Sequence, residues 1–423
     1  MMAAACCNIT DRLFIGDSLG TTALAGLALT LPFMVLLTSV GSLTGTGASI
    51  LIAKAMKKQD VEQGNSILGN AFILSILLSV ALILLLTVFH KRIVLLFGGR
   101  ADTLPYALQY LNIIIPGSIF TNLAVGFCNC MRVCGFATKA ALIILGGILL
   151  NALLNAILFS CGWLSIGSTA CTTVFSMFVC ASVILFHFTN RQRQIRLQTR
   201  YFHTSLKTAY KIILTGMTPF FMNLTICTVS IIMNNYLVIY GGTPAIGAYG
   251  IISSYTILLM MTLAGFCQGM QIGIRSNIEY NKTKLLRKTL YIGAIVTCIG
   301  FLAGEFFSEY FVGFFTADAF LRQQSATGLR IILCTLPVLG FQLVIASFFQ
   351  SIDKTRKALF INMSRQFIFL IPSLFIFSDL WGVTGIWIAI PFADLMATAV
   401  TCLILYIEKR KWHKQQRIIG VTA

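Results

Sequence analysis

The chain of 423 residues is 57% hydrophobic and only 10% charged, and its mean hydropathy is +0.87. A soluble protein of this length cannot bury so much apolar surface, so the composition excludes a water-soluble domain and indicates a membrane protein. The net charge of +18 would suit a nucleic-acid-binding protein, but the positions of the charges along the chain argue against that class.

Eleven apolar stretches are each long enough to cross a hydrocarbon core of about 30 Å. In chain order they are residues 21–53, 65–89, 104–128, 140–160, 166–189, 211–239, 245–272, 289–311, 327–350, 358–378 and 382–407. Residues 1–16 form a further piece that is too short to span. Backbone groups in hydrocarbon must be hydrogen-bonded within their own segment, so the sequence predicts an all-α polytopic membrane protein.

An internal repeat divides the chain into two copies. Gly20-Thr21-Thr22-Ala23 returns as Gly242-Thr243-Pro244-Ala245, and Gly167 with its apolar helix returns as Gly385. Two parallel copies of six helices predict an N-terminal lobe at 1–189, a basic cytoplasmic linker at 190–210, a C-terminal lobe at 211–408 and a basic tail at 409–423. Parallel repeats around a central cavity are typical of secondary transporters.

The repeat also predicts that the first helix is truncated. The helix at 211–239 should have a counterpart in the first copy that begins before Met1 and includes the equivalent of Pro219. What remains would carry Asp11 on a helix too short to span. We therefore expect the true start of the protein to lie upstream of Met1.

Lysine and arginine positions predict the orientation in the membrane. When the helices alternate in direction, most of the 31 Lys and Arg residues fall on the side of the C-terminal tail. This is the positive-inside pattern, and it predicts a multi-pass protein of the inner (plasma) membrane with a cytoplasmic C-terminus. The basic charge therefore reports topology, we expect no nucleic-acid partner, and 190–210 is interpreted as a solvated amphipathic stretch at the lipid surface.

A run of small residues within the span at 21–53 predicts close contact with a neighbouring helix. The run is Gly41-Ser42-x-Thr44-Gly45-x-Gly47, and residues without bulky side chains let two helix backbones approach each other. The alternative is a segment that bends during transport, and the sequence does not separate the two.

Asp11 is a candidate coupling residue on its own chemistry. A carboxylate within a membrane span costs about 2.5–3.5 kcal/mol and usually faces a cavity or a partner. Because loss of water favours the protonated form of a carboxyl group, such a residue can exchange a proton. The alternative is that Asp11 and Arg12 lie at the outer membrane interface.

Two further sets of polar residues lie inside spans. Asn151 and Asn155 are one helical turn apart and share a face, where their amides would bind sodium, hydrogen-bond a neutralised carboxyl group or simply join helices. Arg365 and Asp394 fall at similar depth on antiparallel helices and predict a buried ion pair. That pair is either a structural element of the C-terminal lobe or part of the transport machinery.

Several short motifs along the chain together resemble one transporter family. They are Asp11-x-x-Phe14-Ile15-Gly16-x-x-Leu19-Gly20, Ile67-Leu68-Gly69-Asn70-Ala71, Arg132-x-x-Gly135, Ser364-Arg365-Gln366, Gly382-Val383-x-Gly385-Ile386-Trp387 and Pro391-Phe392-Ala393-Asp394. In order and spacing they resemble the multidrug and toxic compound extrusion (MATE) transporters, and the DinF-like branch in particular. The resemblance covers essentially the whole chain.

The resemblance implies twelve helices in two lobes and antiport of organic cations against H⁺ or Na⁺. It also implies an ion-coupling network in the N-terminal lobe, at positions that match Asp11, Asn151, Asn155 and Thr173 here. Two features depart from the family pattern. Asn155 stands where the family often has Asp, and Gln271 to Tyr280 lacks the Pro and Gly positions usual around the residue that Asn277 matches.

These observations predict a secondary active exporter of amphipathic organic cations rather than an enzyme. We expect a monomer that needs no cofactor or metal beyond its coupling ion, H⁺ or Na⁺, and no P-loop pattern indicates ATP hydrolysis. One alternative is a flippase for lipid-linked oligosaccharides, which would need several buried Arg or Lys residues. Another is a non-transporting remnant, suggested by the truncated first helix and the altered segment at 271–280. The sequence does not identify the substrate.

Overall fold

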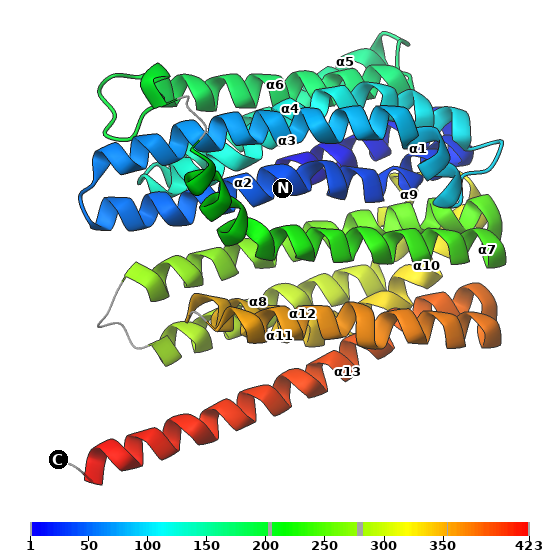
Figure 1. Ribbon diagram of the computed structural model, residues 1–423. Coiled ribbons are helices and arrows are strands. Elements are labelled where there is room, and N and C mark those ends of the chain that lie inside the picture. Colours follow the sequence, from blue (N-terminus) through cyan, green and yellow to red (C-terminus); the bar gives the residue numbers. More distant parts are fainter. Residues whose placement is uncertain (1, 202–204, 277–281, 353, 422–423) are drawn as a thin grey trace. The chain divides into compact units, whose positions relative to one another are not determined.

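The computed structural model describes residues 2–201, 205–276, 282–352 and 354–421, and every element in them is helical (Figure 1). The first half contains α1 (Met2–Leu29), α2 (Leu31–Lys57), α3 (Val61–Leu96), α4 (Leu104–Val133), α5 (Ala137–Ser160), α6 (Ile166–Thr189) and the 3₁₀ turn η1 (Thr199–Tyr201). The second half contains α7 (Leu206–Ser276), α8 (Lys282–Phe306), α9 (Ser308–Gly313), α10 (Ala319–Leu333), α11 (Leu336–Ser351), α12 (Thr355–Met363), the π-helix η2 (Ser364–Leu370) and α13 (Ile371–Val421). Asn277 lies outside the described residues.

Most of the predicted spans lie within continuous helical runs, but the bounds of three are wrong. The span at 21–53 begins in α1 and continues into α2, the span at 289–311 runs from α8 into α9, and the span at 327–350 runs from α10 into α11. Eight described helices are long and apolar enough to cross a bilayer, or nine when α10 and α11, bent by 51° at their junction, are taken as one span. Helix α7 contains two predicted spans, at 211–239 and 245–272, and the run from α12 to α13 contains two more. When these two long runs are counted as two spans each, and α10 with α11 as one span, the described helices contain the eleven spans that the sequence predicts. The prediction of an all-α polytopic membrane protein is confirmed.

Two glycines at equivalent places in the repeat break their helices in the same way. Gly20 interrupts α1 with φ 81° and ψ −174°, and Gly242 interrupts α7 with φ 65° and ψ −161°. A positive φ is accessible to glycine and costly for residues with a Cβ atom. The sequence repeat is therefore also a repeat of backbone conformation at these two positions.

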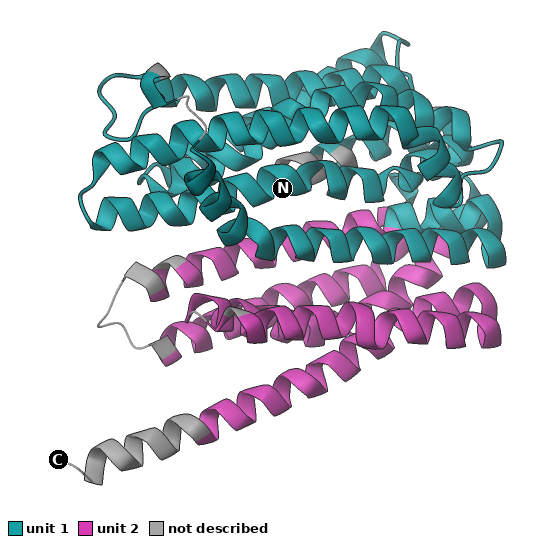
Figure 2. Cartoon of the chain, viewed as in Figure 1, with its two compact units in different colours: residues 1–251, 312–322 teal, residues 252–311, 323–423 magenta. Residues whose placement is uncertain are grey.

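Contacts divide the chain into two compact units, shown in Figure 2. Unit 1 contains residues 1–251 and 312–322, and unit 2 contains residues 252–311 and 323–423. The segment 312–322 of the second half thus packs within unit 1. There, a Cβ atom on Gly16 of α1 would lie only 2.0 Å from the carbonyl oxygen of Phe315. The lobe boundaries predicted from the repeat stay a prediction.

Helix α4 is central to unit 1 and packs against α2, α3 and α6. The small-residue run of α2 meets it directly, since a Cβ atom on Gly45 would lie 2.4 Å from the Cα of Gly126. The Asn122 side chain stabilises this crossing: its Oδ1 accepts from the Gly41 amide at 2.9 Å, and its Nδ2 donates to Ser79 Oγ at 2.9 Å. The structure thus shows close helix contact at the run.

Unit 2 is organised around α11, which packs against α8, α12 and α13. Leu263, Cys267 and Val344 belong to one apolar cluster of this unit. Lys354 and Lys357 both pair with Glu408, whose side chain is 2% exposed. These ion pairs join the segment that begins α12 to α13.

We expect Gly45→Ala to destabilise the protein, because the new methyl group overlaps the backbone of α4. Over-packing of this kind typically costs about 1–3 kcal/mol, and we expect a lower apparent Tm of the purified protein in detergent. The matched control is Gly146→Ala on α5, where a Cβ atom meets nothing within 4 Å. An equal Tm for the two variants would contradict the proposed overlap.

Candidate functional site

Four helices of unit 1 meet around the N-terminal part of α1, which packs against α4, α5 and α6. Cys7 is buried and packs in one apolar cluster with Met177 of α6. Ile15 is also buried, in the cluster that includes Tyr110 of α4. These contacts, one turn to either side of Asp11, place its side chain in the protein interior.

The Asp11 carboxylate is completely buried and accepts hydrogen bonds from all three neighbouring helices. Its Oδ1 accepts from Asn155 Nδ2 at 2.8 Å and has a longer contact of 3.5 Å with Asn151 Nδ2. Its Oδ2 accepts from Thr173 Oγ1 at 2.8 Å and from the Tyr110 hydroxyl at 2.9 Å. The four partners are neutral side chains, so they stabilise the carboxylate by hydrogen bonds and not by a positive charge.

A second layer connects the partners of Asp11 to one another. Asn151 Nδ2 lies 3.0 Å from Thr173 Oγ1, and Thr172 Oγ1 lies 2.6 Å from Asn155 Oδ1. Asn151 Oδ1 is buried and has no hydrogen-bond donor among the described residues. The network therefore retains an unused oxygen acceptor next to a carboxylate, which is the kind of ligand that Na⁺ or a protonated carboxyl group would use.

The sequence of α5 explains why its two asparagines point inward. Asn151 and Asn155 are both fully buried, whereas Leu145, Leu149 and Leu153 are 51%, 61% and 59% exposed. A helix in lipid turns its apolar side chains outward and its polar ones toward other helices. The face with the asparagines is therefore the face against α1 and α6.

The start of α6 is set by a capping box. Ser165 Oγ accepts from the Ser168 amide at 3.0 Å, and Ser168 Oγ accepts from the Ser165 amide at 2.7 Å. These bonds satisfy backbone donors that a helix start leaves free. With the first turn fixed, Thr172 and Thr173 lie on the side of α6 that faces α5 and α1.

The structure brings together Asp11, Asn151, Asn155 and Thr173, the four residues selected from the sequence. Sequence reasoning missed Tyr110 and Thr172, which complete the network. A tyrosine hydroxyl inside an apolar span and a second threonine beside the first were the available signals. Neither signal identifies a hydrogen-bond partner, because the partners lie on other helices.

Asp11 and Arg12 lie in the protein interior, with 0% and 1% of their surfaces exposed. Arg12 also joins α1 to α7 within unit 1, because its Nη1 donates to the Gly250 carbonyl oxygen at 2.6 Å. Both residues therefore face protein partners, and the coupling role of Asp11 stays a prediction.

Arg365 and Asp394 form an ion pair within unit 2. Arg365 Nε donates to Asp394 Oδ1 at 2.5 Å, and Thr335 Oγ1 donates to Asp394 Oδ2 at 3.1 Å. Arg365 lies in the π-helical turn η2, whose wider turn is a feature often found at functional or strained places. The Asp394 side chain is 3% exposed and that of Arg365 is 21% exposed.

The family model for MatE matches residues 1–157 and 219–376, which together are most of the chain. The chain belongs to the MATE family of transporters. This confirms the resemblance drawn from the motifs, and the family is one of transporters rather than enzymes. Within the described part of this MATE chain, no three His, Cys, Asp or Glu side chains are grouped so as to hold a metal ion.

Relatives and solved structures agree with the family. The chain is 22% identical over 403 residues to the multidrug export protein MepA of Staphylococcus aureus (strain MRSA252), covering 95% of this chain and 89% of the relative. It superimposes on an inward-facing multidrug resistance MATE transporter of the MOP superfamily with a TM-score of 0.89, at 19% identity and with 97% and 96% of the two chains covered. The TM-score with the MATE multidrug transporter DinF-BH is 0.80, at 26% identity and with 97% and 93% covered.

We expect Arg365→Ala to destabilise the protein by roughly 3 kcal/mol, because it leaves the buried Asp394 carboxylate without its charge partner. The double variant Arg365→Met/Asp394→Leu removes both charges and should lose less stability than the single variant. Apparent Tm and folded yield in detergent measure both effects. If the double variant loses at least as much stability as the single variant, the Asp394 carboxylate does not need Arg365 as a charge partner.

Proposed function

We propose that this MATE transporter is a secondary active antiporter that exports amphipathic organic cations in exchange for H⁺ or Na⁺. The observation that carries the proposal is the fully buried Asp11 carboxylate, held by hydrogen bonds from Tyr110, Asn151, Asn155 and Thr173. A buried carboxylate that neutral donors surround can change its charge by taking up a cation. MepA is a multidrug export protein and DinF-BH is a multidrug transporter, and both relatives support a broad range of organic substrates for this chain.

In this proposal, the network couples ion binding to the packing of α1. An ionised Asp11 accepts four hydrogen bonds from α4, α5 and α6, whereas a protonated or Na⁺-bound Asp11 must give up or rearrange some of them. The affinity of α1 for its neighbours therefore differs between the two charge states. Such a difference is what lets an ion shift an equilibrium between conformations.

We favour H⁺ as the coupling ion. Asp11 is the one carboxylate of the network, and Asn155 replaces a second carboxylate that the family often has. One negative charge can be neutralised completely by one proton, while Na⁺ is bound better where further charged oxygens surround it. Asn151 Oδ1, which is buried without a donor among the described residues, is the additional oxygen that Na⁺ binding would use.

Neither alternative function gains support from the site. A flippase of lipid-linked oligosaccharides would need several buried cations within the membrane spans, but Arg365 is paired with Asp394 and Arg12 donates to Gly250. A non-transporting remnant would not need an intact network at Asp11. The proposed transporter is a monomer without a cofactor, with its C-terminus in the cytoplasm of a cell whose inner membrane it spans.

Asp11→Asn should reduce dye efflux from cells to the level of an empty vector, since the amide cannot take up a proton or release it. We expect the efflux rate to fall at least about tenfold, because the variant cannot make the charge change that coupling requires. Efflux by the unchanged protein should stop when a protonophore is added. The matched control Asp102→Asn changes an exposed carboxylate of the same unit and should keep full efflux. Dye retention at the vector level by the unchanged protein, with the protein present in the membrane, would contradict antiport of dyes.

The coupling ion can be identified in proteoliposomes. A pH gradient should drive substrate uptake and a Na⁺ gradient alone should not, because one lone carboxylate suits proton exchange. Asn155→Asp places a second carboxylate beside Asp11 and should confer stimulation by Na⁺. Transport by the unchanged protein that requires Na⁺ and ignores pH would reverse the assignment of the ion.

A further inference from the structure

A second polar site lies in unit 1 where the chain leaves α6. Residues 190–198 turn back onto the helices: the Leu197 amide donates to the Phe188 carbonyl at 2.8 Å, and the Arg196 amide donates to Asn65 Oδ1 at 2.8 Å. Ile195 is 4% exposed and packs against Gly64 of α3. This part of the basic segment is therefore folded against the helices, whereas the sequence suggested a solvated stretch at the lipid surface.

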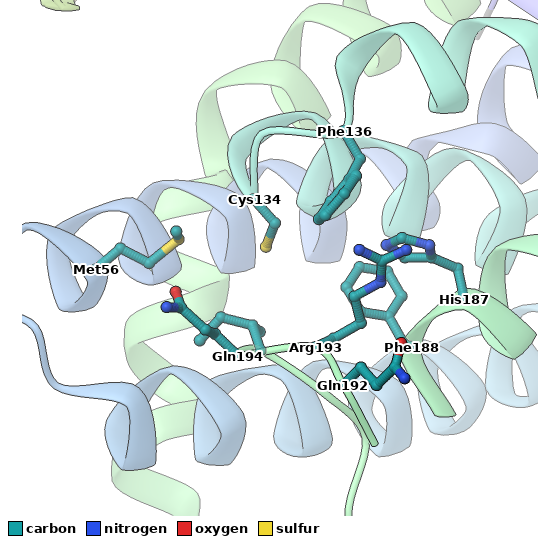
Figure 3. Close-up of a pocket in the computed structure, with 9 residues that line it drawn as sticks. Met56, Cys134, Phe136, His187, Phe188, Gln192, Arg193 and Gln194 are labelled. Carbon is teal, nitrogen blue, oxygen red and sulfur yellow. The ribbon is translucent and has the colours of Figure 1, made fainter. Parts of the chain in front are cut away.

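The folded turn closes one side of a cavity of about 170 Å³. Figure 3 shows Phe136, His187 and Arg193 gathered on one side of it and Met56 and Gln194 on the other. The remaining lining residues are Cys134, Phe188, Gln192 and Ile195. The lining thus combines apolar walls with cationic and amide side chains and includes no acidic residue.

The basic side chains at and beside this cavity lie close to one another. The guanidinium carbon of Arg193 is 4.3 Å from the centre of the Phe136 ring, and the His187 ring centre is 4.7 Å from that same ring. Lys139 Nζ is 3.4 Å from His187 Nδ1. Because an ammonium group only donates, this contact makes Nδ1 the acceptor and places the imidazole proton on Nε2.

Nearby carboxylates do not neutralise these cations. Arg193 Nε is buried and has no hydrogen-bond acceptor among the described residues. The acidic residues of the neighbouring α2–α3 connection are used elsewhere, since Asp60 caps α3 through the Gln63 amide and Glu62 accepts from the Tyr201 hydroxyl. Arg193 and Lys139 both lie near His187 and Phe136, and a bound anion would lower the repulsion between their like charges.

The size and position of the cavity limit what the anion can be. Sites for drug-sized ligands begin at about 300 Å³, so this cavity accommodates a small polar group rather than a transported dye. It lies at the end of α6 that the positive-inside distribution predicts to be cytoplasmic. Basic cavities between helices at that level are suited to phosphate-bearing head groups.

We propose that Arg193, Lys139 and His187 form a binding site for a phosphate-bearing anion, separate from the ion-coupling network at Asp11. The phosphate group would accept hydrogen bonds from the guanidinium and ammonium groups, and Phe136 would hold the guanidinium in place by its ring face. An anionic phospholipid head group and a soluble phosphate carry the same chemistry. The bound anion would tie 190–198 to α5 and α6 and so stabilise unit 1.

The test measures the apparent Tm of the full-length protein in neutral detergent during titration with dioctanoyl phosphatidylglycerol. Dioctanoyl phosphatidylcholine is the control lipid, and inorganic phosphate is the soluble probe. We expect phosphatidylglycerol to raise the Tm of the unchanged protein more than phosphatidylcholine does, less strongly at high salt. Arg193→Gln should weaken the apparent affinity roughly fivefold, the value expected for loss of one cation contact at a lipid surface.

Arg191→Gln removes the same charge from the same turn at an exposed position and should leave the titration unchanged. Lys139→Gln, also at an exposed position, gives a second test if Arg193→Gln does not fold. A response to inorganic phosphate that depends on Arg193 or Lys139 would assign the site to a soluble phosphate instead of a lipid. Equal responses of the unchanged protein and both site variants, or the absence of any response, would overturn the proposal.

Discussion

Removing a carboxylate from water costs several kcal/mol unless other groups replace the lost hydrogen bonds, and this constraint organises unit 1. The Asp11 carboxylate uses both oxygens, which bind donors from α4, α5 and α6. None of those helices can shift far without leaving a buried acceptor unsatisfied. The apolar contacts of Cys7 and Ile15 hold α1 in the same place, so packing and hydrogen bonding fix one arrangement.

Unit 2 meets the same constraint with a different chemistry. Asp394 is paired with Arg365 and also accepts from Thr335. The guanidinium group of Arg365 offsets part of the cost of burying the Asp394 carboxylate. The hydrogen-bond partners of Asp11 are neutral, and we propose that this carboxylate changes its charge during transport. The two copies of the repeat thus surround their buried carboxylates differently, one with neutral donors and one with a charge partner.

The basic residues on the predicted cytoplasmic side serve more than one purpose. Their distribution predicts the orientation of the chain, and some of them also make specific contacts. Lys354 and Lys357 pair with Glu408 in unit 2. In unit 1, Arg193 lines a cavity without an acidic lining residue, and Lys139 contacts His187 of the same cavity. Paired cations contribute to the fold, whereas we propose that Arg193 and Lys139 bind an external anion.

The sequence by itself determined the membrane class, the positions of most spans and the shared face of Asn151 and Asn155, because hydropathy and helical periodicity depend on residues close together in the chain. The family resemblance had placed Thr173 in the network, but only the tertiary structure decided that the hydroxyl groups of Tyr110 and Thr173 donate to Asp11, and that part of 190–210 folds onto the helices. Asp11 is separated from these two partners by 99 and 162 residues. No local pattern specifies such a meeting, since it depends on how four helices pack side by side.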